Sequence, residues 1–415
     1  MAQRVLRVGV DALSVERMAT AVQRSGVEFL AKSFTAEELA YCLDDPQRLA
    51  GRWAAKEAVI KCFDRTPICF RRGKIEVLSS EEGAPRVRLL DGDPAGARVE
   101  VSITHHSGMA VAAAILEMGA PEEPPLPPPP DVHVPERPLE GHKGTFGSVV
   151  AIAGSLGFTG AAYLCATGAA RAGAGTVRLL VAETIYPILA TKCTEVMATP
   201  VPEAAPGVLE PSAYEVAIER LLEAAACGIV GPGLGQADPT RQLIRRVLTG
   251  ARCPLVVDAD ALNAIAADRS LLGHLSGDRV LTPHPGEMSR LTGLPTAEVQ
   301  RDRRGIAVKA AREWGAVVVL KGAHTIVAGP DGQVSEDPHE VPALGTGGTG
   351  DVLSGVIAGL LAQHLDPFQA AVTGVYVHAE AGRRISERLG SSGLLASDLF
   401  DEIPLVMRSL RQAGR

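Results

Sequence analysis

The residues best suited to chemistry lie in the heptad Gly345–Asp351, whose sequence is GTGGTGD. The small and apolar residues that follow it, 352–361, predict a buried helix. A glycine-rich turn that opens a helix presents free backbone N–H groups at the positive end of the helix dipole, which suits phosphate. A carboxylate is repelled by phosphate, so Asp351 needs another task, as a base facing a hydroxyl or as a metal ligand. The alternative is a plain loop in which Asp351 caps the helix.

A cation, an imidazole and further glycines also follow predicted strands in this half of the chain. They are Lys321, His284, Gly160 and the run Gly233–Gly235, whose glycines would let a large flat ligand approach the backbone. Together with Asp351 they suit phosphoryl transfer to a hydroxyl of a second bound molecule. Each feature alone is weak evidence, because a histidine between prolines or a single glycine-rich turn is often structural.

Two acids and two lysines near the N-terminus form a second candidate site. Asp11 ends a mostly apolar predicted strand, and Glu57 lies on a predicted helix next to Lys56 and one turn before Lys61. Mg²⁺ binds through a few carboxylates together with phosphate oxygens. The four residues could therefore hold Mg²⁺ against a diphosphate. Taken singly, each acid is as readily a helix cap or a solvated residue.

The chain of 415 residues is too long for one ordinary domain. Residues 119–130 are so rich in proline that they predict a stiff, extended spacer. We therefore place one domain at residues 1–118, a linker at 119–138 and a second domain at 139–415. A proline-rich ligand for a partner is the alternative to a linker.

Hydrophobic periodicity predicts an α+β first domain and an α/β second domain with a mainly parallel sheet. The first domain has predicted strands at 4–10, 73–78, 85–90, 98–104 and 109–116, and predicted helices at 16–26, 35–43 and 49–63. The second has predicted strands at 148–153, 176–182, 228–231, 255–258, 279–282 and 317–320, and a helix at 162–172. Ligands bind at the carboxyl edge of such a sheet, where the groups named above would meet.

Composition is that of a soluble globular protein, with 46% hydrophobic and 21% charged residues. The net charge of −7 argues against a general nucleic-acid binder and gives no reason to expect a membrane surface as partner. Seven scattered cysteines without a CxxC motif predict reduced thiols and a cytoplasmic protein. The N-terminus lacks the apolar core of a signal peptide.

The first domain resembles the holo-acyl-carrier-protein synthases, which are small 4′-phosphopantetheinyl transferases. The resemblance rests on VGVD at 8–11, FTAEE at 34–38, RWAAKEA at 52–58 and VSITH at 101–105. It implies that Asp11 and Glu57 ligate Mg²⁺ on coenzyme A and that Lys56, with Lys61, meets its phosphates. A serine of an acyl carrier protein would attack after deprotonation by Glu57 or a bound water. Family members form trimers with shared sites, so a homo-oligomer is expected.

Two features of the first domain leave its activity open. His105 is either a strand-end residue or part of the site. Residues 63–73 replace the glycine-rich stretch that the family usually has after the helix. A catalytically silent oligomerisation module is the alternative for this domain.

The second domain resembles the ribokinase-like kinases and, more narrowly, the ADP-dependent NAD(P)H-hydrate dehydratases. The narrower resemblance rests on GPGLG at 231–235, DADALN at 258–263, TPHPGEM at 282–288, KGAHT at 321–325 and the GTGGTGD heptad. It implies that Ala161, Gly235, His284 and Asp351 contact the hydrate. The residues that it assigns to the adenine nucleotide are Lys321, Gly322, Ala323, His324, Thr325, Gly347, Gly348 and Gly350.

The implied chemistry is ADP-dependent dehydration. Hydroxide leaves the hydrated ring poorly, whereas phosphate transferred from ADP leaves well, so AMP, phosphate and restored NAD(P)H are the products. Asp351 would take the hydroxyl proton, and Mg²⁺ is expected with the nucleotide. The rival is a ribokinase-like kinase that leaves a stable phosphate ester on a small alcohol. Residues 336–344 depart from the asparagine- and glycine-rich run that the family usually carries there.

Overall fold

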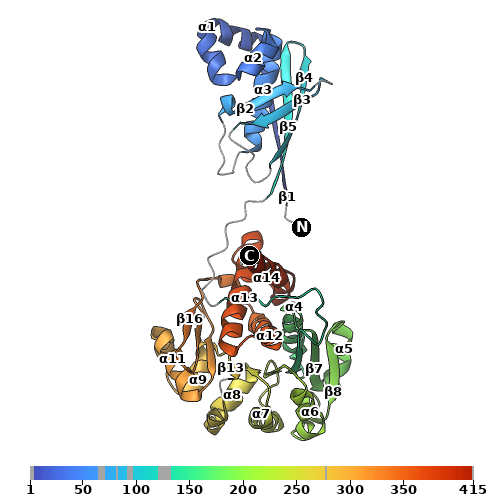
Figure 1. Ribbon diagram of the computed structural model, residues 1–415, viewed down its shortest axis with the longest axis vertical. Coiled ribbons are helices and arrows are strands. Elements are labelled where there is room, and N and C mark those ends of the chain that lie inside the picture. The colour runs from blue at the N-terminus through green and yellow to red at the C-terminus, as the bar shows by residue number, and fades with distance from the viewer. Residues whose placement is uncertain are drawn as a thin grey trace. The chain divides into compact units, whose positions relative to one another are not determined.

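The computed structural model describes residues 4–63, 71–80, 83–90, 97–119, 132–275 and 278–413. The chain divides into two compact units, Met1–Pro124 and Pro125–Arg415, and the division falls inside the predicted linker. Most of that linker, and most of the divergent stretch 63–73, lies outside the described residues. Figure 1 shows both units and labels many of their helices and strands.

The N-terminal unit is α+β, as predicted. Strands β1, β5 and β4 form an antiparallel sheet in that order, and β2 pairs with β3. The elements are β1 (Arg4–Ser14), α1 (Val15–Ser33), α2 (Ala36–Cys42), α3 (Pro46–Cys62), β2 (Ile75–Ser79), β3 (Pro85–Leu89), β4 (Arg98–His106) and β5 (Met109–Gly119). The Thr35 hydroxyl and the Glu38 carboxylate each accept the other residue's backbone N–H, so α2 begins with a capping box.

Helix α3 lies directly on β1 because Gly9 has no side chain. A Cβ at Gly9 would stand 2.0 Å from the carbonyl oxygen of Ala58. Side chains alternate along a strand, so Asp11 points to the same face as Gly9, towards α3. The alternating residues Leu6, Val8 and Val10 are exposed on the other face.

In the described part of the C-terminal unit, the sheet has the order β16-β15-β14-β13-β12-β11-β6-β7-β8. Neighbours from β8 to β14 are parallel, whereas β15 and β16 are antiparallel, so the sheet is mainly parallel, as predicted. Its strands are β6 (Ser148–Ile152), β7 (Thr176–Ala182), β8 (Met197–Val201), β11 (Cys227–Val230), β12 (Leu255–Val257), β13 (Arg279–Leu281), β14 (Val317–Leu320), β15 (Ile326–Ala328) and β16 (Val334–Glu336). A small ribbon pairs β9 (Glu203–Ala205) with β10 (Val208–Leu209).

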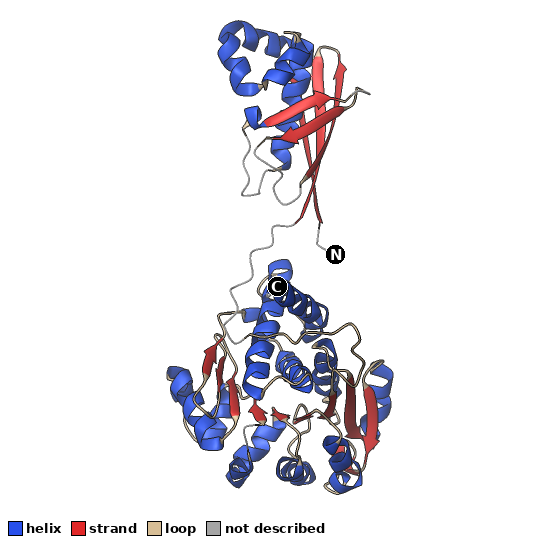
Figure 2. Ribbon diagram, viewed as in Figure 1, coloured by secondary structure: helices blue, strands red, loops and turns tan. Residues whose placement is uncertain are grey.

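Helices cover both faces of this sheet. Figure 1 shows α4, α12 and α13 on one side and α6, α7 and α8 on the other, and Figure 2 shows the strands between these two helical layers. The helices are α4 (Thr159–Arg171), α5 (Tyr186–Lys192), α6 (Glu219–Glu223), α7 (Asp238–Gly250), α8 (Asp260–Ala267), α9 (Pro285–Thr292), α10 (Thr296–Arg301), α11 (Arg303–Trp314), α12 (Thr349–Ala362), α13 (Pro367–Leu389) and α14 (Leu399–Ala413). Strand β6 has β7 on one side and β11 on the other, which makes a topological switch point. The ends of these two strands are where such folds bind ligands.

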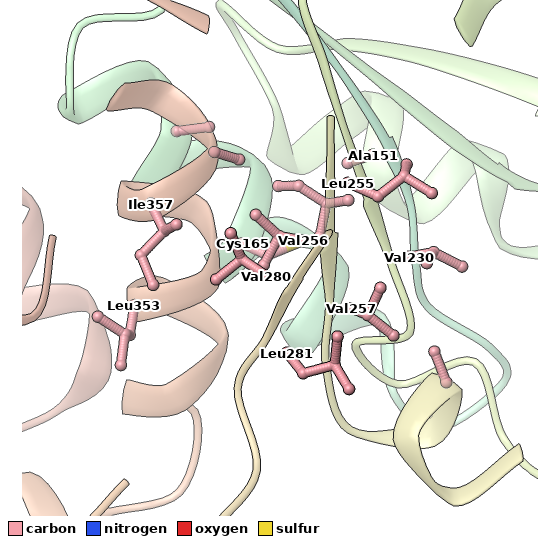
Figure 3. Packing of buried hydrophobic residues seen from close by; sticks show 14 of the residues in the cluster. Ala151, Cys165, Val230, Leu255, Val256, Val257, Val280, Leu281, Leu353 and Ile357 are labelled. Carbon is pink, nitrogen blue, oxygen red and sulfur yellow. The ribbon is translucent and has the colours of Figure 1, made fainter. Parts of the chain in front are cut away.

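The core of this unit packs on both faces of the sheet, with α12 on one of them. Leu353 and Ile357 of α12 are buried, and Val256 and Val257 of β12 point to opposite faces (Figure 3). Helix α12 packs on α4 with backbone in contact, since a Cβ at Gly355 would stand 2.1 Å from the carbonyl oxygen of Cys165. Within the described residues, no helix combines the length and apolar character that a bilayer crossing requires.

Candidate active sites

A buried ion pair lies at the carboxyl edge of the C-terminal sheet. Lys321, directly after β14, places Nζ 2.8 Å from Oδ1 of Asp258, directly after β12. The Ser354 hydroxyl of α12 donates to the other carboxylate oxygen at 2.7 Å. Burial alone would raise the pKa of Asp258, but Lys321 and these hydrogen bonds hold it below its usual value. Burial would lower the pKa of Lys321, but Asp258 and Glu287 raise it. The lysine is therefore a fixed cation.

The glycine-rich turn begins α12 beside this cation. Gly348, at φ +92°, precedes the helix and offers no side chain to cap its N–H groups. A Cβ at Gly350 would stand 3.5 Å from Lys321 Nζ, and nothing lies within 4 Å of one at Gly347. The turn thus combines N–H groups that no side chain caps, open space and a lysine, which suits an anion.

Asp351 lies in the first turn of α12, three residues after the cap position Gly348, so the alternative in which Asp351 caps the helix does not hold. Burial and the neighbouring charge of Asp258 raise the pKa of Asp351 to about 7, although Lys321 opposes the shift. A carboxyl group with such a pKa exchanges a proton readily near neutral pH, as a general base must.

His284 caps α9 and is held as a neutral ring. Its Nδ1 accepts the N–H groups of Gly286 and Glu287, which leaves the proton on Nε2. Burial, Lys321 and Arg290 lower the pKa of His284. The Glu287 carboxylate accepts the His284 N–H at 2.8 Å, and its own pKa is raised to about 7, chiefly by burial. His284 therefore offers one half-exposed N–H donor next to a buried acid.

The switch point brings Ala161 close to the glycines after β11. A Cβ at Gly233 would stand 2.9 Å from the Ala161 Cβ. The N–H of Gly235 donates to the Asp260 carboxylate at 2.8 Å, and the charge of Asp260 also helps to raise the pKa of Asp351. Next to Gly235 lies an open cavity of about 460 Å³ lined by Gln236, Asn263, Ala266, Ala267 and Arg290.

The turn Lys321–Thr325 after β14 is tightly folded. Gly322 has a φ of +145° and His324 one of +52°. The Arg303 guanidinium donates to the carbonyl oxygens of Leu320 and Lys321. The Thr325 hydroxyl donates to the Gly322 carbonyl oxygen at 2.8 Å.

In the N-terminal unit, both candidate metal ligands are paired with cations. Lys61 Nζ lies 2.8 Å from Asp11 Oδ1, and Arg72 forms an ion pair with Glu57. Glu57 lies one turn before Lys61 on α3, so the two carboxylates share one neighbourhood. Among the described residues, no cluster of three or more His, Cys, Asp and Glu side chains could hold a metal. Two carboxylates do suffice for Mg²⁺ when phosphate oxygens complete its shell.

The predicted phosphate contact of Lys56 is not supported. Its side chain has no exposed surface, and Nζ lies 2.6 Å from the Glu38 carboxylate. The ammonium also donates to the carbonyl oxygens of Ser33 and Arg72, so its hydrogens are used within the core. A cavity of about 540 Å³ beside Glu57 is lined instead by Lys32, Ile60, Arg71 and Arg72. His105 bonds through Nε2 to the Gln47 carbonyl oxygen, at the other end of α3 from Glu57.

Comparison with known proteins gives a match over most of the chain. Residues 149–405 match the family model described as NAD(P)H-hydrate dehydratase. The chain belongs to the NAD(P)H-hydrate dehydratase family. Residues 7–114 match the 4′-phosphopantetheinyl transferase superfamily. Both matches confirm the predicted families and fold classes.

Individual relatives agree with this assignment. The chain is 47% identical over 279 residues to the bifunctional NAD(P)H-hydrate repair enzyme of Moorella thermoacetica, covering 67% of this chain and 52% of that protein. It is 37% identical to the ADP-dependent (S)-NAD(P)H-hydrate dehydratase of Bacillus subtilis, covering 66% and 94%. A crystal structure of the Bacillus subtilis ADP/ATP-dependent NAD(P)H-hydrate dehydratase, co-crystallised with ATP and Mg²⁺, is similar with a TM-score of 0.55 and 33% identity, covering 66% and 94%. The chain thus spans about half the length of the bifunctional relatives that it matches.

Within the dehydratase-family unit, the structure brings Lys321, Gly350 and Asp351 together. Glu287 connects His284 to them, because its Oε2 lies 3.9 Å from Lys321 Nζ. The roles of Asp258, Ser354 and Glu287 were not predicted from the sequence. For Asp258 the sequence does carry a signal. An acid that directly follows an all-apolar strand is expected to be buried, and a buried charge needs a partner.

Proposed function

We propose that the C-terminal unit dehydrates (S)-NAD(P)H hydrate with ADP as phosphoryl donor, releasing NAD(P)H, AMP and phosphate. The observation that carries the proposal is a titratable Asp351 in the uncapped first turn of α12, beside the fixed cation Lys321. This pairs a base with an anion site, as phosphoryl transfer to a hydroxyl requires. Family membership selects the hydrate among possible hydroxyl compounds.

In this proposal the two substrates meet at Asp351. The nucleotide occupies the turns Lys321–Thr325 and Gly347–Gly350, and the hydrate lies against Ala161, Gly235 and His284. Asp351 accepts the hydroxyl proton while the hydroxyl oxygen bonds to the β-phosphorus of ADP and the bond to AMP breaks. Phosphate then leaves the ring with the electron pair of its C–O bond, and loss of a proton from the adjacent carbon restores the double bond.

The remaining groups bind and orient the two substrates. The N–H groups of Gly347–Gly350 and the Lys321 ammonium stabilise negative charge on the transferring group. The neutral His284 donates its Nε2 hydrogen to the hydrate. Mg²⁺ bound to the nucleotide would supply further charge neutralisation, with phosphate oxygens and water as most of its ligands.

The test uses the full chain with ADP, Mg²⁺ and hydrated NADPH. Equal amounts of NADPH, AMP and inorganic phosphate are expected, and Asp351→Asn should slow their formation by roughly 10²–10⁴. A stable phosphate ester on the substrate, without NADPH, would instead support the kinase alternative.

We propose a second activity for the N-terminal unit, the transfer of 4′-phosphopantetheine from coenzyme A to a serine of an acyl carrier protein. The superfamily match and the shared neighbourhood of Asp11 and Glu57 support it. These carboxylates would hold Mg²⁺ once the paired cations Lys61 and Arg72 turn to the phosphates. Lys32 and Arg71 would add charge, in place of Lys56.

Mass spectrometry of an apo carrier protein incubated with coenzyme A and Mg²⁺ tests this activity. The unmutated chain should add the phosphopantetheine mass, and Asp11→Ala and Glu57→Ala should not. An unmutated chain that adds nothing would favour a silent oligomerisation module.

We further propose that the chain acts in the cytoplasm as a homo-oligomer assembled through its N-terminal sheet. The exposed side chains of Leu6, Val8, Val10 and Ile115 form an apolar face opposite α3. Exposed apolar faces of this kind mark interfaces. Sedimentation velocity should show an oligomer that Val8→Asp dissociates.

A further inference from the structure

A buried histidine lies in the divergent segment between β16 and the glycine-rich turn. The His339 side chain is 1% exposed and is placed between two carboxylates. Its Nδ1 lies 3.0 Å from Asp337 Oδ1, and its Nε2 lies 3.1 Å from Glu380 Oε2 on α13. Both ring nitrogens face acceptors, so both donate and the ring is an imidazolium.

Other charged and titratable groups complete the surroundings of His339. Glu380 also accepts from Arg383 and Arg384, one turn further along α13. The ring of Tyr376 lies edge-on to His339, with centroids 5.0 Å apart. Burial alone would lower the pKa of His339, but Asp337 and Glu380 raise it to about 9.

The backbone around His339 is bonded to the turn that the proposed function gives to the nucleotide. The His324 N–H donates to the His339 carbonyl oxygen at 3.1 Å, and the Asp337 N–H donates to the Thr325 carbonyl oxygen at 2.9 Å. His324 occupies the left-handed region, with a φ of +52°. Such a conformation persists only where its surroundings hold it.

Helix α13 also contacts the second nucleotide turn. The His378 Nε2 lies 2.9 Å from the carbonyl oxygen of Thr349, the first residue of α12. His378 and Glu380 are two residues apart on α13. One helix therefore supports both the Lys321–Thr325 turn, through His339, and the glycine-rich turn.

We propose that His339 is a positioning residue for the adenine nucleotide, which fixes the Lys321–Thr325 turn to α13 through its two charge-assisted hydrogen bonds. The inference rests on the proposed function only in placing an adenine nucleotide at these turns. His339 touches neither substrate and acts through His324 and Thr325. Its loss should therefore affect nucleotide binding and leave the chemical step intact.

The test compares His339→Gln with a matched control, Gln363→Met. Gln363 is also buried and donates two hydrogen bonds, but it lies at the far end of α12. Calorimetry with ADP should give a Kd about tenfold higher for His339→Gln, as expected for the loss of a charged hydrogen bond. In turnover assays the KM for ADP should rise likewise, with kcat and the KM for the hydrate unchanged. The control should lower the Tm and leave ADP binding as it is.

Two results would overturn the inference: an unchanged ADP Kd in His339→Gln, or an equal loss in the control. If His339→Gln does not fold, the unmutated chain still decides, because its ADP affinity must fall as pH rises through about 9. A constant affinity across that range contradicts the proposed role. If the unmutated chain binds ADP but does not convert the hydrate, the proposed reaction is wrong, whereas this inference about ADP binding still holds.

Discussion

Lys321 Nζ lies 2.8 Å from Asp258 Oδ1, which fixes a cation beside the glycine-rich turn of α12. Ser354 holds the same carboxylate from inside the helix. The ion pair therefore connects β12, β14 and α12 at the point where the phosphoryl group is proposed to move.

Breaking this pair should be costly. Lys321→Met leaves the buried Asp258 without its partner. Because the buried charge is then uncompensated, the free energy of unfolding should fall by about 3–5 kcal/mol. The double variant with Asp258→Asn should recover part of that loss. Urea unfolding of the single and double variants checks this, and equal losses in both would contradict it.

Asp351 should give the dehydration a pH dependence. The base form is present above the pKa of about 7, so kcat/KM should rise with pH through that value and then level off. Asp351→Asn should lower kcat by roughly 10²–10⁴, the range for loss of a general base. A pH–rate profile of both proteins measures this, and an unmutated enzyme with a flat profile around neutrality would argue against Asp351 as base.

The stability contribution of His339 should disappear at alkaline pH. Its folded-state pKa of about 9 lies above the ordinary value of 6.5, so protonation stabilises the folded state. The contribution is complete below about pH 6.5 and is lost as pH rises through about 9. The stability gap between the unmutated chain and His339→Gln should narrow over this range in urea unfolding, and a widening gap would refute the imidazolium.

Arg290 should contact the anionic part of the dinucleotide. It lines the cavity beside Gly235, and its Nε donates to Asn263 Oδ1 at 2.9 Å. Arg290→Gln should raise the KM for NADPH hydrate about tenfold, as for a lost charge-assisted hydrogen bond, without changing the Kd for ADP. The KM for hydrated nicotinamide mononucleotide should rise less in Arg290→Gln than the KM for NADPH hydrate.

The control for Arg290 is Arg245→Gln, an exposed arginine of α7 that pairs with Asp268. Equal KM values for NADPH hydrate in Arg290→Gln and the unmutated chain would place the dinucleotide elsewhere.

The sequence predicts the buried parallel strands well, because they are short, mostly apolar runs rich in Val and Leu. β7 and β14 have the predicted bounds, 176–182 and 317–320. The first strand is predicted to end at Asp11, but β1 continues to Ser14, since its pairing with β5 extends to Met109. That extension depends on a partner distant in sequence. The three-residue strands β15 and β16 were not predicted, and in β16 the polar residues Ser335 and Glu336 leave no apolar run.

The residues of the site also fall into those that local sequence reveals and those that depend on partners distant in sequence. The glycine-rich turn, Lys321 and Asp351 are evident from local sequence. The partners that set their charge, Asp258 and Glu287, depend on how strands and helices pack. Lys56 shows the opposite error, since its motif indicated a phosphate contact but the fold buries it against Glu38.

The glycine contacts between α12 and α4 set a steric tolerance on the anion site. Gly355 and Gly168 allow backbone to touch backbone, and a Cβ at Gly168 would stand 2.7 Å from the Val352 carbonyl oxygen. One added methyl group would displace the whole helix, including the N–H groups at its first turn. The position of the N–H groups that we propose bind phosphate therefore depends partly on a helix–helix contact that no substrate reaches. Substitutions at that contact should first appear as lost turnover.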